Sequence, residues 1–460
     1  MFKRLLFLIC LLFIHCGNEQ NKLQSAFFGG QIIKPSSDYV SLYKFGERFD
    51  SLPLDAQNRF SKHYDSLAFG LFKMEHLPEN QMVLIEPGDS IWARANMADF
   101  NASLVFSGTG SAKNNFLMDT YLKLQNEVRF LSSKYAQDSQ VFSTIIDSLL
   151  KEQKQSWTAF EKMTSLSPLA QKVTQAAYVY PYANRRERYA LIRGKKTVEK
   201  DSNYFKFRRF LNYGERDLVF FEPYINYMMS YLSQEALGEG ESYFQKKNTT
   251  EFNIRRIQII DDRISNPILR NTLARTVAYE ELLNFQNHKN HERFLQFYVR
   301  LNTSPLYLNE ILGLHQSLMQ MESGKFLANI ELESHDGTIN FSNDVLIGQP
   351  TVLYFWSQTQ MNHFKRTQER VKKYQALYPN YRYVGICIQP YNELVLNYQN
   401  IMNINPKDQY AVVDFEKVSK AWVITLLNKG IIIDSKGKIL NGFANFSSQN
   451  FPDILDQYTP

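Results

Sequence analysis

The chain has 460 residues and a formal net charge of +6, with 44% hydrophobic and 14% aromatic residues. This length exceeds what one hydrophobic core usually organises, so we expect several domains, and the composition argues against a disordered chain. Because charges of both signs are mixed along the sequence, the small positive excess does not favour a nucleic-acid partner.

The first residues have the pattern of a secretory signal peptide. Lys3 and Arg4 precede an apolar run over residues 5–14 that is too short to span a bilayer. The run ends in Phe-Ile-His-Cys-Gly, which resembles a bacterial lipobox, although His15 replaces the small residue that is usual there. The pattern predicts a signal peptide over residues 1–16, with a cleaved leader carrying a chance cysteine, or an uncleaved anchor, as alternatives.

The lipobox-like pattern predicts acylation of Cys16, followed by a polar tether over residues 17–25. Several acyl chains on one cysteine would anchor the protein stably, because a single chain binds a membrane only marginally. We therefore expect a cell-envelope protein that is held to a membrane by lipid and faces the periplasm or the cell surface.

The cysteine count limits the redox chemistry of such an exported chain. The sequence contains Cys10, Cys16 and Cys387; the first leaves with the leader and the second is blocked by lipid. One thiol then remains, so no intramolecular disulfide is expected. Cys387 lies within an apolar run over residues 383–388, which favours a small buried hydrophobe over a reactive thiol.

Residues 26–110 consist of short alternating apolar segments separated by turn residues. Segments at residues 39–43, 70–74, 81–85 and 90–94 read as strands, and Glu86-Pro87-Gly88-Asp89 reads as a turn between two of them. The pattern predicts a small antiparallel β domain of the sandwich type.

From residue 111 to residue 322 the apolar period becomes helical. The apolar residues Phe142, Ile145, Ile146 and Leu149 fall at the spacing of one helix face. Further helices are predicted at residues 169–180, 221–237, 266–285 and 292–321. We see no repeat of fixed length, so we predict an all-α middle domain.

Strands and helices alternate from residue 323 to residue 460, as in an α/β domain. The predicted elements are a hairpin at 330–341, a strand at 351–356, a helix at 362–377, a strand at 383–388, a helix at 391–401, a strand at 411–413, a helix at 418–422 and a hairpin at 430–443. The whole chain is thus predicted to be a multidomain α+β protein.

The last 135 residues or so resemble the TlpA/ResA branch of the thioredoxin superfamily. The matching residues are Asp336-Gly337, Phe341-Ser342, Gly348-Gln349-Pro350, Phe355-Trp356, Asp414, Ala421-Trp422-Val423, Ile433-Asp434 and Gly437-Lys438-Ile439. The resemblance implies a thioredoxin-like domain, and the β domain before it is similar to the one that precedes such domains in Bacteroidetes lipoproteins.

The residues that carry redox chemistry in that family are absent here. The family places Cys-x-x-Cys at a helix start, where the helix dipole lowers the pKa of the first cysteine. On that pattern Gln360 takes the place of the nucleophile and His363 that of the resolving cysteine. Asn428 stands where the family has a cis-proline, so we expect a trans peptide bond there. Neither Gln360 nor His363 can form a mixed disulfide, and we predict no catalytic residue, cofactor or metal at this site.

Two other groups of residues are candidate sites. His288 and His291 have a spacing that could bring two imidazoles together, but without a third ligand we favour a solvated helix face. The basic cluster Arg185, Arg186, Arg188, Arg193, Lys195 and Lys196 could hold an anionic or peptide partner, and a solvated face is again favoured. No phosphate loop, dinucleotide turn, Gly-x-Ser-x-Gly elbow or His-Glu-x-x-His motif occurs in the sequence.

The sequence therefore predicts a redox-inactive thioredoxin-like domain that serves binding or scaffolding, with an envelope protein or peptide as partner and no nucleic acid. Thiol-disulfide chemistry in periplasmic redox homeostasis, through Cys387 or another non-standard site, is the alternative. A solute pocket between the β and helical domains is a third hypothesis.

Overall fold

The structure is a computed structural model that describes residues 25–65, 69–198, 203–358, 360–391, 395–396, 399 and 404–458. The chain forms two compact units, one of residues 1–125 and 159–174 and the other of residues 126–158 and 175–460. Each unit is described by itself. The predicted signal peptide and Cys16 lie outside the described residues, and the division into three domains at residues 110 and 322 stays a prediction.

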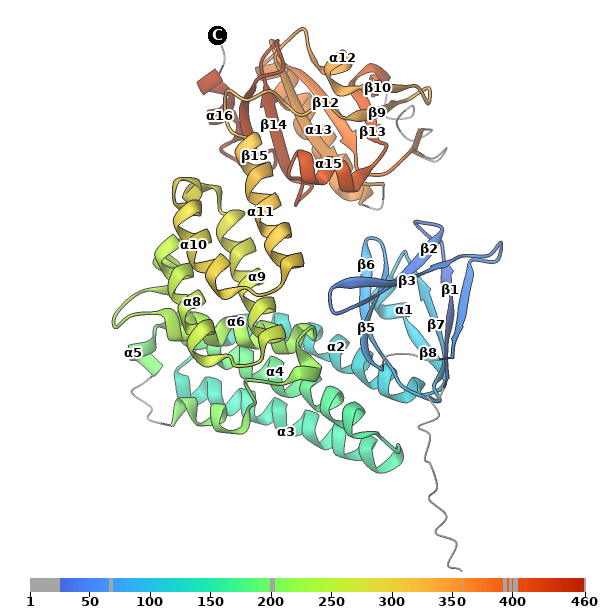
Figure 1. Cartoon of the computed structure of the whole chain (residues 1–460), viewed down its shortest axis with the longest axis vertical. Helices are drawn as coiled ribbons and strands as arrows, with labels where there is room; N and C mark the ends of the chain where they lie inside the picture. Colours follow the sequence, from blue (N-terminus) through green and yellow to red (C-terminus); the bar gives the residue numbers. More distant parts are fainter. Residues whose placement is uncertain are drawn as a thin grey trace, which may run out of the picture. The chain divides into compact units, whose positions relative to one another are not determined.

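The first unit is built on two four-stranded sheets, with strand orders β4-β1-β7-β8 and β3-β2-β5-β6 (Figure 1). The strands are β1 (Ala26–Ile33), β2 (Tyr39–Lys44), β3 (Glu47–Pro53), β4 (Arg59–Tyr64), β5 (Gly70–His76), β6 (Glu79–Ile85), β7 (Ser90–Asn96) and β8 (Val105–Thr109), with a short helix α1 (Phe100–Ser103) before β8. Phe28 and Ile91 of the first sheet share one buried core with Val40 and Phe72 of the second. The predicted β sandwich is therefore present.

One pairing differs from the antiparallel domain that we predicted. Strands β1 and β7 pair in parallel, with Phe28 opposite Ile91, whereas β1–β4 and β7–β8 are antiparallel. Parallel neighbours need a long crossover connection, and here the five strands β2 to β6 supply it. The alternation of apolar residues cannot reveal such a pairing, because it is the same in both directions.

A buried ion-pair network joins the sandwich to the first helix after it. The Nζ atom of Lys113 lies 2.8 Å from a carboxylate oxygen of Glu86 and 2.7 Å from one of Asp89. Lys113 belongs to the first turn of α2 (Ser111–Ser132), and both acids belong to the turn predicted between β6 and β7. Because all three side chains are largely shielded from water, removal of one partner would leave an uncompensated buried charge.

The middle of the chain is helical, as predicted. The helices after α2 are α3 (Ser139–Met163), α4 (Pro168–Arg193), α5 (Lys195–Val198), α6 (Glu222–Ala236), α7 (Tyr243–Lys246), α8 (Thr250–Arg263), α9 (Pro267–Leu282), α10 (His291–Leu301) and α11 (Pro305–Gln320), with 3-10 turns at Ser133–Ala136, Tyr204–Phe210, Arg216–Leu218 and Phe285–Asn290. The single helix predicted over residues 292–321 is wrong, because it is α10 and α11. Ser304 caps α11 by accepting a hydrogen bond from the Tyr307 amide, and Pro305 occupies the first helical position, where its missing N–H costs nothing.

The C-terminal part of the second unit contains a seven-stranded sheet with the order β10-β9-β13-β12-β11-β14-β15. Its elements are β9 (Glu331–Ser334), β10 (Ile339–Phe341), α12 (Ser342–Leu346), β11 (Thr351–Trp356), α13 (Met361–Leu377), β12 (Arg382–Cys387), a 3-10 turn (Pro406–Asp408), β13 (Gln409–Val412), α15 (Phe415–Ala421), β14 (Lys429–Ile433), β15 (Ile439–Asn445) and α16 (Phe451–Tyr458). Strands β11, β12 and β13 are parallel, and β14 runs antiparallel to β11.

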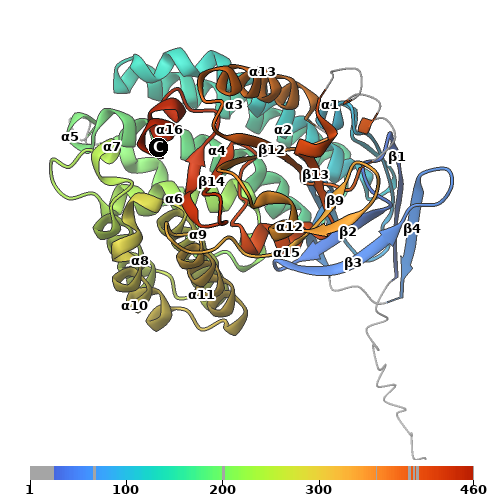
Figure 2. The same cartoon turned by 90° about the horizontal axis from the view of Figure 1, so that it is seen from above.

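Helices cover both faces of this sheet. Tyr374 of α13 and Phe451 of α16 belong to one buried core with Val352 and Tyr354 of β11, whereas Trp422, at the end of α15, packs against Phe355. Figure 2 shows α13 and α16 on one side of β12 and β14, with α15 on the other. Because adjacent strand residues point to opposite faces of a sheet, the side chains of Tyr354 and Phe355 lie on opposite sides of it. Most of the helix predicted at 391–401 lies outside the described residues, and the described residues 395, 396 and 399 are helical. The other predicted elements of this region occur, whereas α12 and α16 were not predicted.

Candidate functional site

The candidate site lies where β11 ends and α13 begins. Trp356, the last residue of β11, is fully buried, and its ring centroid lies 4.1 Å from that of Phe364 in the first turn of α13. This contact fixes the direction in which the chain enters the helix. Gln360 occupies the N-cap position, but its side chain makes no capping hydrogen bond.

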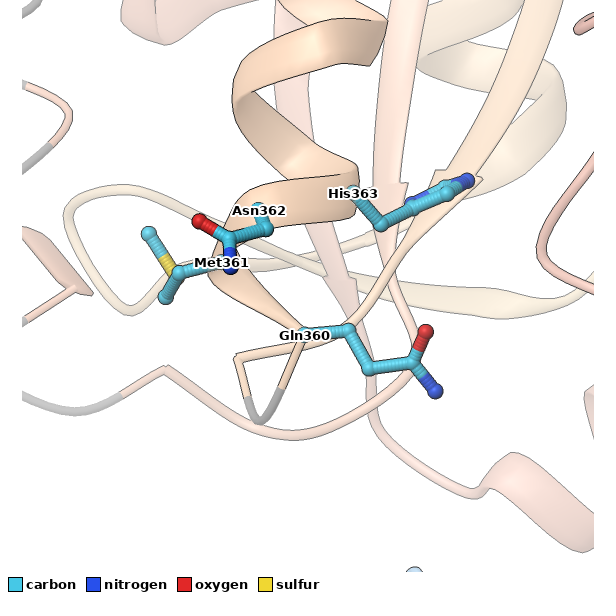
Figure 3. Close-up of a pocket in the computed structure, with 4 residues that line it drawn as sticks. All are labelled: Gln360, Met361, Asn362 and His363. Atoms are coloured by element: carbon cyan, nitrogen blue, oxygen red, sulfur yellow. The ribbon is translucent and has the colours of Figure 1, made fainter. Parts of the chain in front are cut away.

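Four consecutive residues line an open cavity of about 440 Å³ at this helix start, namely Gln360, Met361, Asn362 and His363. Figure 3 shows the side chains of Gln360 and His363 extending to one side and those of Met361 and Asn362 lying on the other. The lining combines two amides, an imidazole and a thioether. It therefore offers hydrogen-bond donors and acceptors and an apolar contact, but no sulfhydryl.

His363 contacts Asn428, the residue at the family's cis-proline position. The imidazole Nε2 of His363 lies 3.1 Å from Oδ1 of Asn428, and the Ser447 hydroxyl donates to the same oxygen over 3.0 Å. Because that oxygen can only accept, Nε2 of His363 carries the proton in this arrangement. The peptide bond before Asn428 is trans in the described chain, where the only cis bond is Leu77–Pro78.

Gln389 links the segments that follow β11 and β12. Oε1 of Gln389 accepts hydrogen bonds from the Ser357 hydroxyl at 3.0 Å and from the Gln358 amide at 2.9 Å. We did not predict Gln389 or Ser447 as site residues. Gln389 could have been predicted from the sequence, because it follows a buried parallel strand, and the carboxyl ends of parallel strands meet at one edge of a sheet.

Cys387, the only cysteine among the described residues, is fully buried at the end of β12. Burial raises the pKa of this thiol to about 12, and the Gln358 amide nitrogen, 3.7 Å from Sγ, opposes that shift only in part. A thiol in this environment stays protonated at neutral pH and is a poor nucleophile. The expectation of a small buried hydrophobe is confirmed.

The other candidate residues lie elsewhere in the second unit. His291 is buried in α10, with its ring centroid 5.9 Å from that of His315, so the solvated face predicted for it is wrong. Within the part of the chain that the structure describes, no group of three or more His, Cys, Asp or Glu side chains could hold a metal ion.

Two residues of the basic cluster form ion pairs inside the helical region. Arg185 pairs with Glu127 of α2, and Arg186, itself buried, pairs with Asp147 of α3. These two residues do not form a solvated face. Their ion pairs tie α4 to its neighbouring helices, and the sequence could not reveal this because the acids lie 39 and 58 residues away.

Matches to known proteins come from solved structures. No protein-family model and no curated protein matches the chain. A putative thiol-disulfide oxidoreductase from Bacteroides vulgatus is 17% identical, covering 30% of this chain and 99% of its own, with a TM-score of 0.26. A domain of a possible thiol-disulfide isomerase from Cytophaga hutchinsonii is 18% identical, covering 30% and 92%, with a TM-score of 0.26.

A third similar structure is the pneumococcal exposed lipoprotein thioredoxin Etrx1 from Streptococcus pneumoniae, which is 15% identical, covers 28% of this chain and 97% of its own, and has a TM-score of 0.22. The C-terminal sheet contains the strand order β12-β11-β14-β15, with α13 after β11 and α16 after β15. The described residues contain no helix with the length and apolar character to cross a membrane.

Proposed function

We propose that this chain is a lipid-anchored cell-envelope protein whose thioredoxin-like domain binds a protein or peptide partner and does not exchange disulfides. The observation that carries the proposal is the contact between His363 and Asn428 at the start of α13. The positions at which the family keeps a dithiol and a cis-proline here hold side chains that hydrogen bond to each other. Such a pair has no sulfur to form a mixed disulfide.

The form of the site supports binding. Its cavity opens to solvent, and Gln360 and Asn362 have amide groups that can pair with a peptide backbone. Asn428 is exposed, and its own carbonyl already accepts a hydrogen bond from the Phe446 amide at 2.8 Å, so the loop is held in place before a partner arrives. Preorganisation of this kind lowers the entropy cost of association.

The alternative, thiol chemistry at Cys387, is less well supported. A two-electron exchange within one molecule needs two thiols, and the exported chain is expected to keep one. Cys387 is also buried, and burial raises its pKa to about 12. The solute pocket between the β and helical domains stays a prediction.

Crosslinking in native envelopes followed by mass spectrometry tests the proposal. The full chain should give crosslinks from the α13 start to a defined partner, and His363→Ala with Asn428→Ala should lose them. Lys436→Ala, in the β14–β15 turn, is the matched exposed control and should keep them. Partner crosslinks that persist unchanged in the double variant would refute binding at this site.

A further inference from the structure

Lys429, the neighbour of Asn428 in the chain, is buried although it carries an amine. Its side chain is 8% exposed, and Nζ donates to the main-chain oxygens of Trp422 at 2.7 Å and Val423 at 3.0 Å. Nζ also lies 4.5 Å from the ring centroid of Phe443. Among the described residues no ion pair joins Lys429 to a carboxylate, so carbonyls and one aromatic face satisfy this group.

The carbonyls that Lys429 binds belong to a strained helix end. The Ile424 amide donates to the Ser419 carbonyl at 2.9 Å, which is the hydrogen bond of a Schellman motif at the end of α15. The residue at the left-handed position of this motif is Val423, with a φ of 50°. Glycine usually occupies that position, because a β-branched side chain is strained there.

Lys429 contacts this helix end from the far end of the loop. The segment from Val423 to Lys429 leaves α15, makes a turn in which the Lys429 amide donates to the Leu426 carbonyl at 3.1 Å, and returns to the sheet. Asn428 lies immediately before this anchor. The Lys429 side chain therefore links the two ends of the loop, directly after Asn428 and at the first residue of β14.

Both protonation states of the amine can hold these contacts. Burial lowers the pKa of Lys429 to about 7, so neutral and charged forms coexist near neutral pH. An ammonium has three N–H donors and a neutral amine has two, and two are enough for the Trp422 and Val423 carbonyls. The contact is thus a hydrogen-bonded clamp and does not depend on charge.

We propose that Lys429 is a positioning residue: by binding the carbonyls of Trp422 and Val423 it holds the 423–428 loop so that Asn428 meets His363. This inference rests on the proposed function in assigning the His363–Asn428 pair to the binding site. It also explains why a valine is tolerated at a left-handed position.

Lys429→Met tests the clamp on the full chain with two site readouts. Carbethoxylation of His363, followed by peptide mapping, reports whether Nε2 is engaged by Asn428. Hydrogen exchange of the Phe446 amide reports whether the Asn428 carbonyl stays in place. Both rates should rise about tenfold in Lys429→Met, since two buried hydrogen bonds are lost. Adding Val423→Gly should restore most of the protection, because glycine adopts the left-handed conformation without help.

Lys44→Met is the matched control. Lys44 is also buried, at 9% exposure, donates to the Phe69 carbonyl at 2.6 Å and lies 4.6 Å from the ring centroid of Phe72, but it belongs to the first unit. It should lower the melting temperature and leave both rates unchanged. If Lys429→Met behaves in the same way, Lys429 is only a stabilising residue and the proposal is wrong.

If Lys429→Met does not fold, Lys429→Gln replaces it in both assays. The glutamine side chain is shorter than that of lysine and cannot reach both carbonyl oxygens, so it also removes the clamp. The two proposals fail separately. Unchanged rates refute the clamp even where a partner binds through His363, whereas raised rates establish the clamp even where no partner is found.

Discussion

Nε2 of His363 and Oδ1 of Asn428 lie 3.1 Å apart, although 65 residues separate them in the chain. The contact joins the start of α13 to the loop before β14. Asn428→Ala should release the imidazole and raise the carbethoxylation rate of His363. The free energy of unfolding should fall by no more than ~1 kcal/mol, because the hydrogen bond is exposed to water. An unchanged rate would mean that the two side chains do not meet in solution.

Gly385→Ala should destabilise the seven-stranded sheet of the C-terminal region. A Cβ atom at Gly385 would lie 2.4 Å from Oε1 of Gln409 and 2.7 Å from the hydroxyl oxygen of Tyr354. Those groups belong to a buried polar network in which Gln409 and Gln368 both donate to the Tyr354 hydroxyl. We expect a loss of ~1–3 kcal/mol in urea-induced unfolding, because close packing leaves no room for the methyl group.

Gly313→Ala supplies the contrast for that measurement. Gly313 lies inside α11, and nothing within 4 Å would meet its Cβ. Since alanine favours a helix by ~1 kcal/mol over glycine, this substitution should stabilise the protein. Equal effects of the two substitutions would contradict the packing that we describe around Gly385.

His291 should make the helical region sensitive to acid. Burial, followed by the nearby His315 and His288, lowers the pKa of His291 from 6.5 to about 4. A base whose pKa is lower in the folded state gives its full stability above pH 6.5, and that stability is lost as the pH falls toward 4. The loss should approach ~3 kcal/mol and be smaller in His291→Phe, as measured by urea unfolding between pH 7 and pH 4. Equal pH dependence in both proteins would contradict this.

Acylation of Cys16 is directly testable in cells. Labelled palmitate should enter the wild-type chain and not Cys16→Ser, which should also lose its membrane association. Cys10→Ser is the control, because Cys10 lies within the predicted leader and should leave labelling intact. Label that remains in Cys16→Ser would place the lipid on another residue, and a wild-type chain without label would exclude acylation.

The sequence predicted the strands and helix that carry the site, because β11 and α13 have strong apolar patterns. It did not predict β1, which contains Gly29 and Gly30. In the structure a Cβ at Gly30 would lie 2.3 Å from the Ala93 carbonyl oxygen. Only glycine therefore allows β1 to pack this closely against β7. Strand β3 was missed because, of its apolar residues, only Leu52 is buried.

The contacts within the site could not be predicted from the sequence. Gln360 and His363 were found by their spacing, but the meeting of His363 with Asn428 depends on how β14 pairs with β11. Ser447 and Lys429 complete the arrangement from the end of β15 and the start of β14, and no local pattern marks either residue. Tertiary pairing decides such contacts, whereas periodicity reports only local structure.

Turnover of a protein disulfide tests the central claim most directly. In an insulin-reduction assay, the chain without residues 1–16 should show no activity above buffer, since it has one buried thiol. Gln360→Cys with His363→Cys restores the Cys-x-x-Cys spacing at the start of α13 and serves as the positive control. Sustained insulin reduction by the unsubstituted chain would contradict a redox-inactive domain.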